Sequence, residues 1–183
     1  MYLPSEDSLL LAESVKQYSG QSALEIGVGS GIILRILHDN FKIVAGTDIT
    51  FESLRYCKDN LPNNVMLVCC DAASVFRYRF DLIVTNPPYL PDEEYKKRFH
   101  ESAIHGGHTG IETTLRFIKS AVSVLSQNGK MLIIISTLSD VSKMDELIIE
   151  MKLKRRTIRE KKLFFETLTV VEISFKWLSL LFQ

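Results

Sequence analysis

Short apolar runs alternate with amphipathic segments along most of the chain, and this alternation constrains its fold more than any other feature. Strands are expected at 23–26, 42–47, 65–68, 81–85 and 131–136, and helices at 32–38, 53–60, 112–125 and 141–150. Asn128 and Gly129 are expected to end the helix at 112–125. Repeated strand–helix units of this kind build a mostly parallel sheet with helices on both faces. Ligands of such sheets bind beyond the carboxyl ends of the strands, so candidate site residues are sought in the loops that follow them.

The two ends of the chain depart from this alternation. Pro4 and Ser5 introduce a helix whose first turn carries two acids, which suit the positive end of the helix dipole, and Gly20 is expected to end it. Near the other end, 155–160 and 168–175 are strand-like with no helix between them, which predicts an antiparallel pair at one edge of the sheet. A chain of 183 residues is expected to form one domain, 1–183.

Composition excludes several classes of protein. The 22 Lys and Arg residues balance 22 Asp and Glu residues, so the chain lacks the broad positive charge of a protein that grips many nucleic-acid phosphates, although a local basic patch is not excluded. The three cysteines, Cys57, Cys69 and Cys70, form neither a CxxC pair nor a disulfide framework, so we expect reduced thiols. No signal peptide or membrane-spanning run is present, which predicts a cytoplasmic protein.

A glycine-rich loop follows the first expected strand. Gly27, Gly29 and Gly31 permit a tight turn and a close approach of the backbone to a ligand, but such a loop alone is weak evidence. Spacing strengthens it, because Asp48 ends the second expected strand 21 residues after Gly27, close to the about 20-residue offset of a ribose-binding acid. With Asp71 at the end of the third strand, the loop predicts a nucleotide-like ligand.

The acids around this loop indicate which ligand. The loop is G-x-G-x-G rather than the G-x-G-x-x-G of dinucleotide folds, and a pyrophosphate would gain little from Glu25, two residues before the first glycine. An adenosine with a cationic amino-acid end fits better, and S-adenosylmethionine has that shape. Taken singly, the acids have simpler interpretations: a solvated strand end for Glu25, a helix N-cap for Asp48 and a turn for Asp71.

The fourth expected strand leads into Asn86-Pro87-Pro88-Tyr89. The prolines fix the backbone and donate no hydrogen bonds, which leaves carbonyl oxygens and the Asn86 side-chain oxygen free to accept. Two acceptors suit a planar NH2 group and stabilise positive charge that develops on nitrogen during attack on a methyl sulfonium. Tyr89 offers a flat face for an amide or a base. In isolation the motif would be read as a proline-rich turn; here it predicts N-methylation.

Together these motifs resemble the class I S-adenosylmethionine-dependent methyltransferases and, within them, the HemK-like amide and amine N-methyltransferases. The resemblance covers nearly the whole chain and rests on 24–31, Asp48, Asp71 and 81–89. Tyr2-Leu-Pro-Ser-Glu-Asp-Ser8 and 165–170 are similar to the short archaeal and eukaryotic branch, which methylates the glutamine of the GGQ loop in class I release factors. The resemblance implies a Rossmann-like α/β fold: a mostly parallel seven-stranded sheet, an antiparallel C-terminal edge pair, helices on both faces, and an N-terminal helix, 1–20, over the cofactor site.

The resemblance also implies roles for individual residues. Cofactor binding falls to Ser8, Glu25, Gly27, Gly29, Gly31, Asp48, Asp71, Ala72 and Asn86, and transfer to Asn86, Pro87, Pro88 and Tyr89. Ser8, Glu25 and Gly27 would meet the amino-acid end, Asp48 the ribose hydroxyls, and Asp71 with Ala72 the adenine. Asn86 and the Pro87 carbonyl would hold the substrate amide. Serine stands at position 8 where threonine is more usual, which keeps the hydroxyl.

A long loop, 91–110, separates this motif from the next expected helix, and loops of this length are usually functional. It carries three of the four histidines, His100, His105 and His108, and its glycines resemble the family's glycine-rich turn beside the substrate pocket. Metal binding is an alternative for the histidines. The family needs no metal, so we expect a solvated loop that faces the substrate.

Three functions compete. The leading one is methylation of a release factor at its GGQ glutamine, with S-adenosyl-L-methionine as cofactor. A nucleic-acid N-methyltransferase that acts on adenine N6 or guanine N2 is the alternative, because the same motif serves it and the cations at 96–98 and 152–162 favour it, but zero net charge and the lack of a base-reading domain oppose it. A noncatalytic binding protein is opposed by the intact motif. Relatives of the branch often need a small zinc-binding activator subunit that covers an apolar sheet edge.

Overall fold

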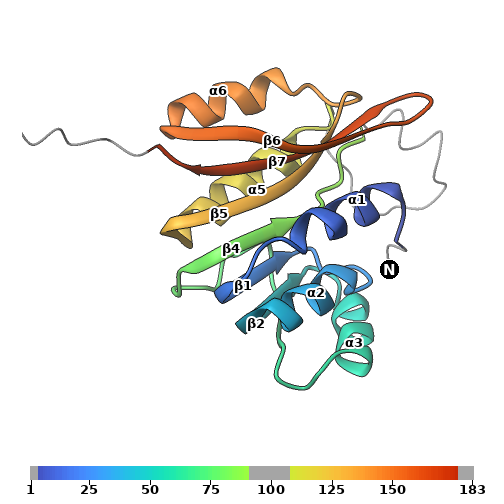
Figure 1. Cartoon of the computed structure of the whole chain (residues 1–183), viewed down its shortest axis with the longest axis vertical. Helices are drawn as coiled ribbons and strands as arrows, with labels where there is room; N and C mark the ends of the chain where they lie inside the picture. The colour runs from blue at the N-terminus through green and yellow to red at the C-terminus, as the bar shows by residue number, and fades with distance from the viewer. Residues whose placement is uncertain (1–3, 91–107, 177–183) are drawn as a thin grey trace, which may run out of the picture.

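The computed structural model describes residues 4–90 and 108–176. Its strands form one seven-stranded sheet in the order β3-β2-β1-β4-β5-β7-β6 (Figure 1). The strands are β1 (Gly20–Ile26), β2 (Phe41–Asp48), β3 (Met66–Cys69), β4 (Phe80–Thr85), β5 (Leu125–Ser136), β6 (Leu153–Lys162) and β7 (Thr167–Phe175). The helices are α1 (Glu6–Val15), α2 (Ile32–Asn40), α3 (Phe51–Asn60), α5 (Glu112–Ser123) and α6 (Ser142–Glu150).

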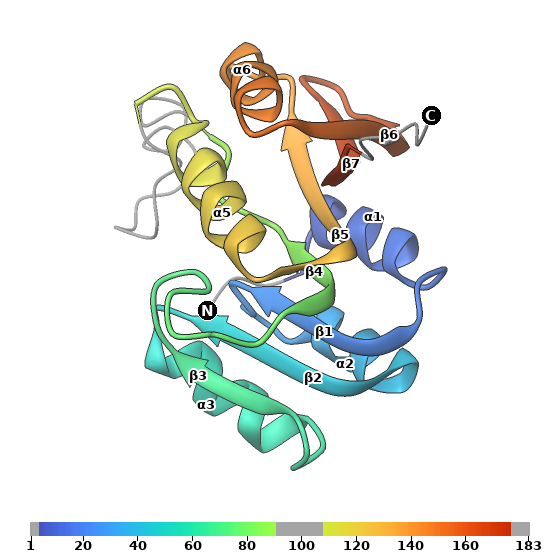
Figure 2. The ribbon, with the colours of Figure 1, turned by 90° about the vertical axis from the view of Figure 1, so that its left-hand side faces the viewer.

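The first five strands are parallel, and β7 runs antiparallel between β5 and β6. The predicted α/β class and the antiparallel edge pair are therefore confirmed. Helices α1, α2 and α3 pack on one face of the sheet, and α5 and α6 on the other, so that the sheet is the middle of three layers (Figure 2).

The central strands are apolar on both sides because both of their faces are covered. In β5, Met131 and Ile133 pack beneath α5 and α6, whereas Leu132 and Ile134 pack beneath α1 and α2, and all four are fully buried. This two-sided burial explains why the run at 131–135 is a continuous apolar stretch without being a membrane segment. No helix in the described residues is long and apolar enough to span a membrane.

Several boundaries differ from those predicted. Gly20 opens β1 instead of ending the first helix, which stops at Val15. Helix α5 ends at Ser123 rather than at 125. β5 begins at Leu125 and continues past Gly129. Along this stretch the register of its pairing with β4 shifts, between Phe80 and Leu82. A Cβ on Gly129 would lie 2.9 Å from the Phe80 carbonyl oxygen. Glycine is needed there because two backbones approach closely, and not to end a helix.

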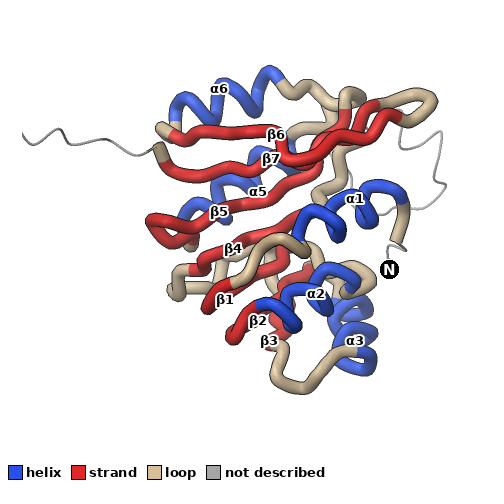
Figure 3. The backbone as a smooth tube through the Cα atoms, viewed as in Figure 1, coloured by secondary structure: helices blue, strands red, loops and turns tan. Residues whose placement is uncertain are grey.

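The two edges of the sheet differ in length and chemistry. β3 has four residues and an exposed Met66. β6 has ten residues, most of them exposed and many of them cationic. The turn between β6 and β7, at 163–166, lies at the same end of the molecule as the start of α1 (Figure 3).

Candidate active site

Parallel register brings the residues after β1, β2 and β4 to one edge of the sheet. Ile26 lies beside both Thr47 of β2 and Thr85 of β4. The residues that follow these three positions, Gly27, Asp48 and Asn86, therefore begin neighbouring loops. The structure thus assembles the glycine loop, the second acid and the start of the Asn-Pro-Pro-Tyr motif from segments far apart in the sequence.

The glycine loop uses left-handed backbone conformations that other residues rarely adopt. Gly27, Gly29 and Gly31 have φ of 78°, 46° and 75°. A Cβ on Gly27 would meet no atom within 4 Å, so this backbone borders open space that a ligand can approach. A Cβ on Gly31 would lie 2.9 Å from Cys57 Sγ, so the third glycine allows α2 and α3 to pack closely.

Glu25 is a buried acid at the end of β1 whose side chain is incompletely paired. It is 4% exposed, and its Oε2 has no hydrogen-bond partner in the described part of the chain. Burial raises the pKa of Glu25 well above its ordinary value; a hydrogen bond from the Leu34 backbone lowers it, and the charge of Asp48 raises it further. A cationic ligand would complete the pairing of this carboxyl group.

Asp48 joins the loops after β1 and β2. Its Oδ1 accepts hydrogen bonds from the Thr50 backbone N–H (2.8 Å) and hydroxyl (2.7 Å), and its Oδ2 accepts one from the Gly29 N–H (3.2 Å). Thr50, rather than Asp48, is the N-cap residue of α3. The simpler interpretation of Asp48 as a helix cap is therefore wrong, and its carboxylate instead fixes the shape of the glycine loop.

The first helix contacts the Asn-Pro-Pro-Tyr motif directly. Asn86 Nδ2 donates to Ser8 Oγ at 3.4 Å, and the Tyr89 hydroxyl donates to Asp7 Oδ2 at 3.3 Å. Asn86 Oδ1 is buried and has no partner among residues 4–90 and 108–176. With Nδ2 committed to Ser8, this oxygen is left to accept a hydrogen bond from a substrate. Besides Glu25 Oε2, the other buried side-chain oxygens without a partner in the described chain belong to Thr47 and Thr114.

Asp7 lies against the candidate active site, although the sequence indicated for it only a favourable position at the positive end of the helix dipole. It is 3% exposed, and its Oδ1 accepts hydrogen bonds from the Ser8 backbone N–H (2.6 Å) and the Ser5 hydroxyl (2.5 Å). Ser5 occupies the N-cap position as predicted, but its hydroxyl bonds Asp7 instead of capping the helix. The signal was present, because Asp7 lies inside the motif at 2–8 together with Ser8.

Within the motif itself, Pro87 is buried, and Pro88 and Tyr89 are half-buried. The prolines thus hold the turn against the body of the protein while the Tyr89 hydroxyl reaches the first helix. All described peptide bonds in this turn are trans.

Asp71 and Ala72 lie farther along the same edge. β3 ends at Cys69, so Asp71 stands in the following turn and not at the strand end that was predicted. Its two carboxylate oxygens each lie 2.7 Å from Nη1 of Arg116 on α5. Ala72 is buried and has φ of 49°, a strained conformation for alanine. Arg116 belongs to no sequence motif and lies 45 residues from Asp71, so this pairing could not be predicted from local sequence.

The cations of 152–162 are partly neutralised within the fold. Arg155 forms an ion pair with Asp145 of α6, Arg156 with the buried Glu172 of β7, and Lys161 with Glu6 of α1. These pairs tie the edge strand to the elements beside it. They reduce the charge available for phosphates and weaken the nucleic-acid alternative. The second basic cluster, 96–98, lies outside the described residues.

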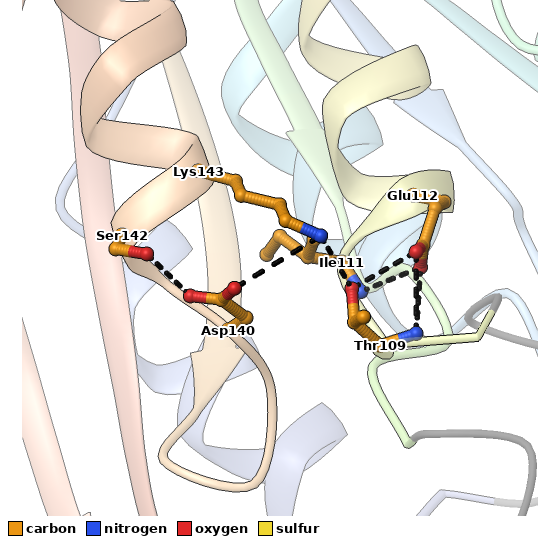
Figure 4. A network of polar contacts seen from close by, with 6 residues as sticks. All are labelled: Thr109, Ile111, Glu112, Asp140, Ser142 and Lys143. Carbon is orange, nitrogen blue, oxygen red and sulfur yellow. Dashed lines mark hydrogen bonds and ion pairs between the residues drawn. The ribbon is translucent and has the colours of Figure 1, made fainter.

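A polar network fixes the start of α5, where the described chain resumes (Figure 4). The Thr109 hydroxyl donates to Glu112 Oε1 (2.9 Å), and Lys143 Nζ donates to Thr109 Oγ1 (3.3 Å). Burial raises the pKa of Glu112, but hydrogen bonds from Thr109 and Ile111 lower it more, so it lies below its ordinary value. The Thr109 backbone N–H also donates to Glu112 Oε1 (3.2 Å), but the N-cap residue of α5 is Ile111, so Thr109 and Glu112 do not form a capping box.

The histidine loop is described only at its end. His100 and His105 lie outside the described residues, and His108 is exposed. Within 4–90 and 108–176, no group of three or more His, Cys, Asp or Glu side chains is placed to hold a metal ion.

The chain matches the model of the methyltransferase small domain family over residues 6–166. It belongs to this family. A relative from Methanocaldococcus jannaschii, named "Putative protein N5-glutamine methyltransferase MJ0928", is 30% identical over 181 residues, which cover 93% of this chain and 90% of that protein. The release factor glutamine methyltransferase of Bradyrhizobium diazoefficiens is 32% identical over 142 residues, 70% of this chain and 48% of that protein. This chain thus spans about half the length of that bacterial relative.

Solved structures share the fold. One of them is the E. cuniculi Mtq2–Trm112 complex, which is responsible for the methylation of the eRF1 translation termination factor. The superposition has a TM-score of 0.73 at 22% sequence identity and covers 96% of this chain and 98% of that one. A T. thermophilus 16S rRNA N2 G1207 methyltransferase gives 0.70 at 19% identity, with 95% and 44% covered. At these identities the likeness concerns the fold alone, and the expected Rossmann-like methyltransferase fold and family are confirmed.

Proposed function

We propose that this methyltransferase small domain protein transfers a methyl group from S-adenosylmethionine to the side-chain amide nitrogen of a glutamine, the one in the GGQ loop of a class I release factor. The observation that carries the proposal is the buried Oδ1 of Asn86, which has no hydrogen-bond partner among the residues that the structure describes and which lies just after β4, before two prolines. The names of the relatives from M. jannaschii and B. diazoefficiens support the choice of glutamine and of release factor.

The residues around Glu25 fit this cofactor. Glu25 Oε2 is an unpartnered buried acceptor that suits a cationic amino group, and the backbone at Gly27 borders open space. Asp48, whose carboxylate accepts hydrogen bonds from Thr50 and Gly29, would meet the ribose hydroxyls, while Asp71 and Ala72 would border the adenine. When bound, the cofactor supplies an electrophilic methyl group on a positively charged sulfur.

The chain's part in transfer is to hold the amide nitrogen in line with that methyl group. Ser8 holds the Asn86 amide so that Oδ1 accepts one N–H of the substrate, and the Pro87 carbonyl accepts the other. These acceptors stabilise positive charge as it develops on the nitrogen. The new C–N bond would form as the methyl–sulfur bond breaks, with S-adenosyl-L-homocysteine as the leaving group. The nitrogen would then lose one proton to water, so no side chain has to act as a base.

A small partner subunit is part of the proposal. The structural neighbour Mtq2 forms a complex with Trm112. In this chain the β3 edge is only four residues long, and apolar side chains that are more than half exposed lie at both of its ends: Met66 at the start of the strand, and Ile49, whose carbonyl contacts Cys69, at its end. We propose that a small zinc-binding partner, of the kind expected from the sequence, binds this edge. Cytoplasmic localisation is a separate prediction, made from the sequence.

The decisive experiment is tritiated-methyl transfer from S-adenosylmethionine to three substrates offered separately: a class I release factor, its GGQ-to-GGA variant and total RNA. We expect label on the release factor that disappears in the GGA variant. Label on RNA alone would replace the proposal with nucleic-acid methylation. If no substrate is labelled, the assay is repeated with the small partner subunit present, and continued absence of label would refute the proposal.

A further inference from the structure

Two adjacent aromatic side chains are almost fully exposed in the turn between β6 and β7. Phe164 is 92% exposed and Phe165 is 74% exposed, the highest values among the large apolar side chains of the described residues. Their rings lie edge to face with centroids 4.6 Å apart. We call Phe164 and Phe165 the aromatic tip. Side chains of this size are normally buried, so their joint exposure requires an explanation.

The aromatic tip lies at the active-site edge of the sheet. Leu168 of β7 pairs with Ser136 at the carboxyl end of β5, and Ile133 of β5 pairs with Thr85, the residue before Asn86. On the other side of the hairpin, Lys161 forms an ion pair with Glu6, next to Asp7 and Ser8. Figure 1 shows the hairpin and the start of α1 at the same end of the molecule.

The turn that presents the tip is held by hydrogen bonds. The Leu163 N–H donates to the Glu166 carbonyl at 2.8 Å, and the Ser136 hydroxyl donates to Glu166 Oε2 at 2.6 Å. The Thr167 N–H donates to Thr137 Oγ1 at 3.0 Å. Leu163 packs on the core beneath α1. The two rings therefore project from an anchored hairpin, which lowers the entropy lost when they bind a partner.

We propose that the aromatic tip is a docking point for the protein substrate: it packs against an apolar surface of the release factor outside the GGQ loop. This inference rests on the proposed function. A glutamine that reaches Asn86 on a large protein brings the rest of that protein over the same edge of the sheet, where the tip projects. Exposed aromatic residues on a rigid support are typical of the few residues that dominate protein–protein affinity.

The surrounding charges favour a protein over a membrane or a nucleic acid. Lipid headgroups and phosphates call for unpaired cations beside the aromatic residues. Here Lys161 is paired with Glu6, and the exposed Lys162 beside the tip is accompanied by the acid Glu166 of the turn. The tip therefore combines apolar contact with little net positive charge.

The test compares the double variant Phe164→Ser/Phe165→Ser with a matched control, Ile149→Ser. Ile149 is 70% exposed and lies near the C-terminal end of α6. The strand that follows, β6, begins beside Phe175 at the end of β7, so Ile149 is far along the strands from the β6–β7 turn. Each protein, with its partner subunit if that is required for activity, is assayed with the intact release factor and with a short peptide that contains the GGQ sequence. Binding of S-adenosylhomocysteine is measured by calorimetry as a check on the cofactor site.

We expect the double variant to lose about 10- to 100-fold in kcat/KM with the intact factor, mostly through KM, and to keep wild-type activity with the peptide. The control should match wild type with both substrates. Equal activity of wild type and double variant on the intact factor would overturn the inference, and so would an equal loss on the peptide, which would place the tip in the active site itself.

Three other outcomes would also overturn it: loss of a wild-type self-association in sedimentation, loss of binding to anionic vesicles, or loss of binding to RNA, each in the double variant alone. If wild type labels neither the factor nor the peptide, the proposed function fails rather than the docking assignment alone.

Discussion

Glu25 and Glu172 are two glutamates of this fold that are equally buried and oppositely surrounded. Glu25, at the active-site edge, is 4% exposed, and its Oε2 has no partner in the described structure. Glu172, on β7, is 5% exposed and accepts hydrogen bonds from Tyr18 (2.7 Å) and Arg156 (2.7 and 3.1 Å), with Lys130 at 3.6 Å.

The pKa values of the two side chains move in opposite directions. Burial alone raises the pKa of both groups. For Glu172, the hydrogen bonds from Arg156 and Tyr18 and the charge of Lys130 outweigh burial and lower it. Hydrogen-bonding and charged partners therefore distinguish a carboxylate that stabilises the fold from one that is left for a ligand. Asn86 Oδ1 belongs with Glu25 in this comparison, because it is also buried without a partner.

Removing the unpartnered amide oxygen should have the largest effect. Asn86→Ala is expected to lower kcat for methyl transfer by about 10²–10³-fold, the cost typical of losing one acceptor or donor that acts on transition-state charge. Affinity for S-adenosylhomocysteine should stay close to wild type in calorimetry. Asp48→Ala is the converse variant, with cofactor affinity affected first. Wild-type transfer rates in both variants would show that the active site has been assigned wrongly.

The next largest effect should come from Glu25→Gln, which keeps the shape of the side chain and removes its charge. We expect affinity for S-adenosylhomocysteine to fall about 10- to 100-fold, because a charge-assisted contact with the amino group is lost. Glu172→Gln is the matched control in the same calorimetry, with unchanged affinity. An equal loss in both variants would remove the functional difference between the two glutamates.

Glu172→Gln should instead act on stability. We expect the free energy of unfolding in denaturant to fall by about 1–2 kcal/mol near neutral pH, a figure reduced because Arg156 and Lys130 are largely exposed. Since the folded pKa of Glu172 is lowered, its stabilisation is present above the unfolded pKa and disappears as pH falls through the folded value. The difference from wild type should therefore vanish in acid. Glu146→Gln, at an exposed position, serves as the control.

The smallest effect expected is a gain in stability for Glu25→Gln without cofactor. Because the folded pKa of Glu25 is raised, the wild type loses stability as pH rises from the unfolded pKa through the folded value. Glutamine does not ionise, so the variant should be the more stable protein at about pH 8 and similar to wild type at about pH 4. Denaturant unfolding curves at the two pH values measure the difference in stability. A variant less stable than wild type at both pH values would contradict the raised pKa of Glu25.

The sequence predicted the central sheet and the core of the candidate site for one physical reason. Strands buried on both faces are continuous apolar runs, and parallel register places the residues that follow them at one edge. Asp48 and Asn86 stand where expected strands end, and Glu25 is next to the last residue of another, so the register makes the three neighbours in space.

What the sequence could not provide are pairings between distant residues. Arg116 holds Asp71 from α5, and the acids that neutralise Arg155, Arg156 and Lys161 come from three different elements. Nothing in local patterning marks such partners, so the cluster at 152–162 resembled a free basic surface. Gly129 was misinterpreted for a similar reason, because the backbone it approaches belongs to Phe80.

Because α1 and the residues after it contact β6 and β7, the helix can dock only after these strands have been synthesised. Glu6 of α1 pairs with Lys161, and Tyr18, three residues after α1, donates to Glu172, across sequence separations of 155 and 154 residues. Helix α1 is synthesised before β6 and β7, so it must wait for these strands before it settles over the sheet. Ser8, which orients Asn86, travels with that helix. A nascent chain would thus contain the glycine loop and the Asn-Pro-Pro-Tyr turn long before it could align an amide for transfer, and the active site becomes complete only when the β6–β7 hairpin has formed.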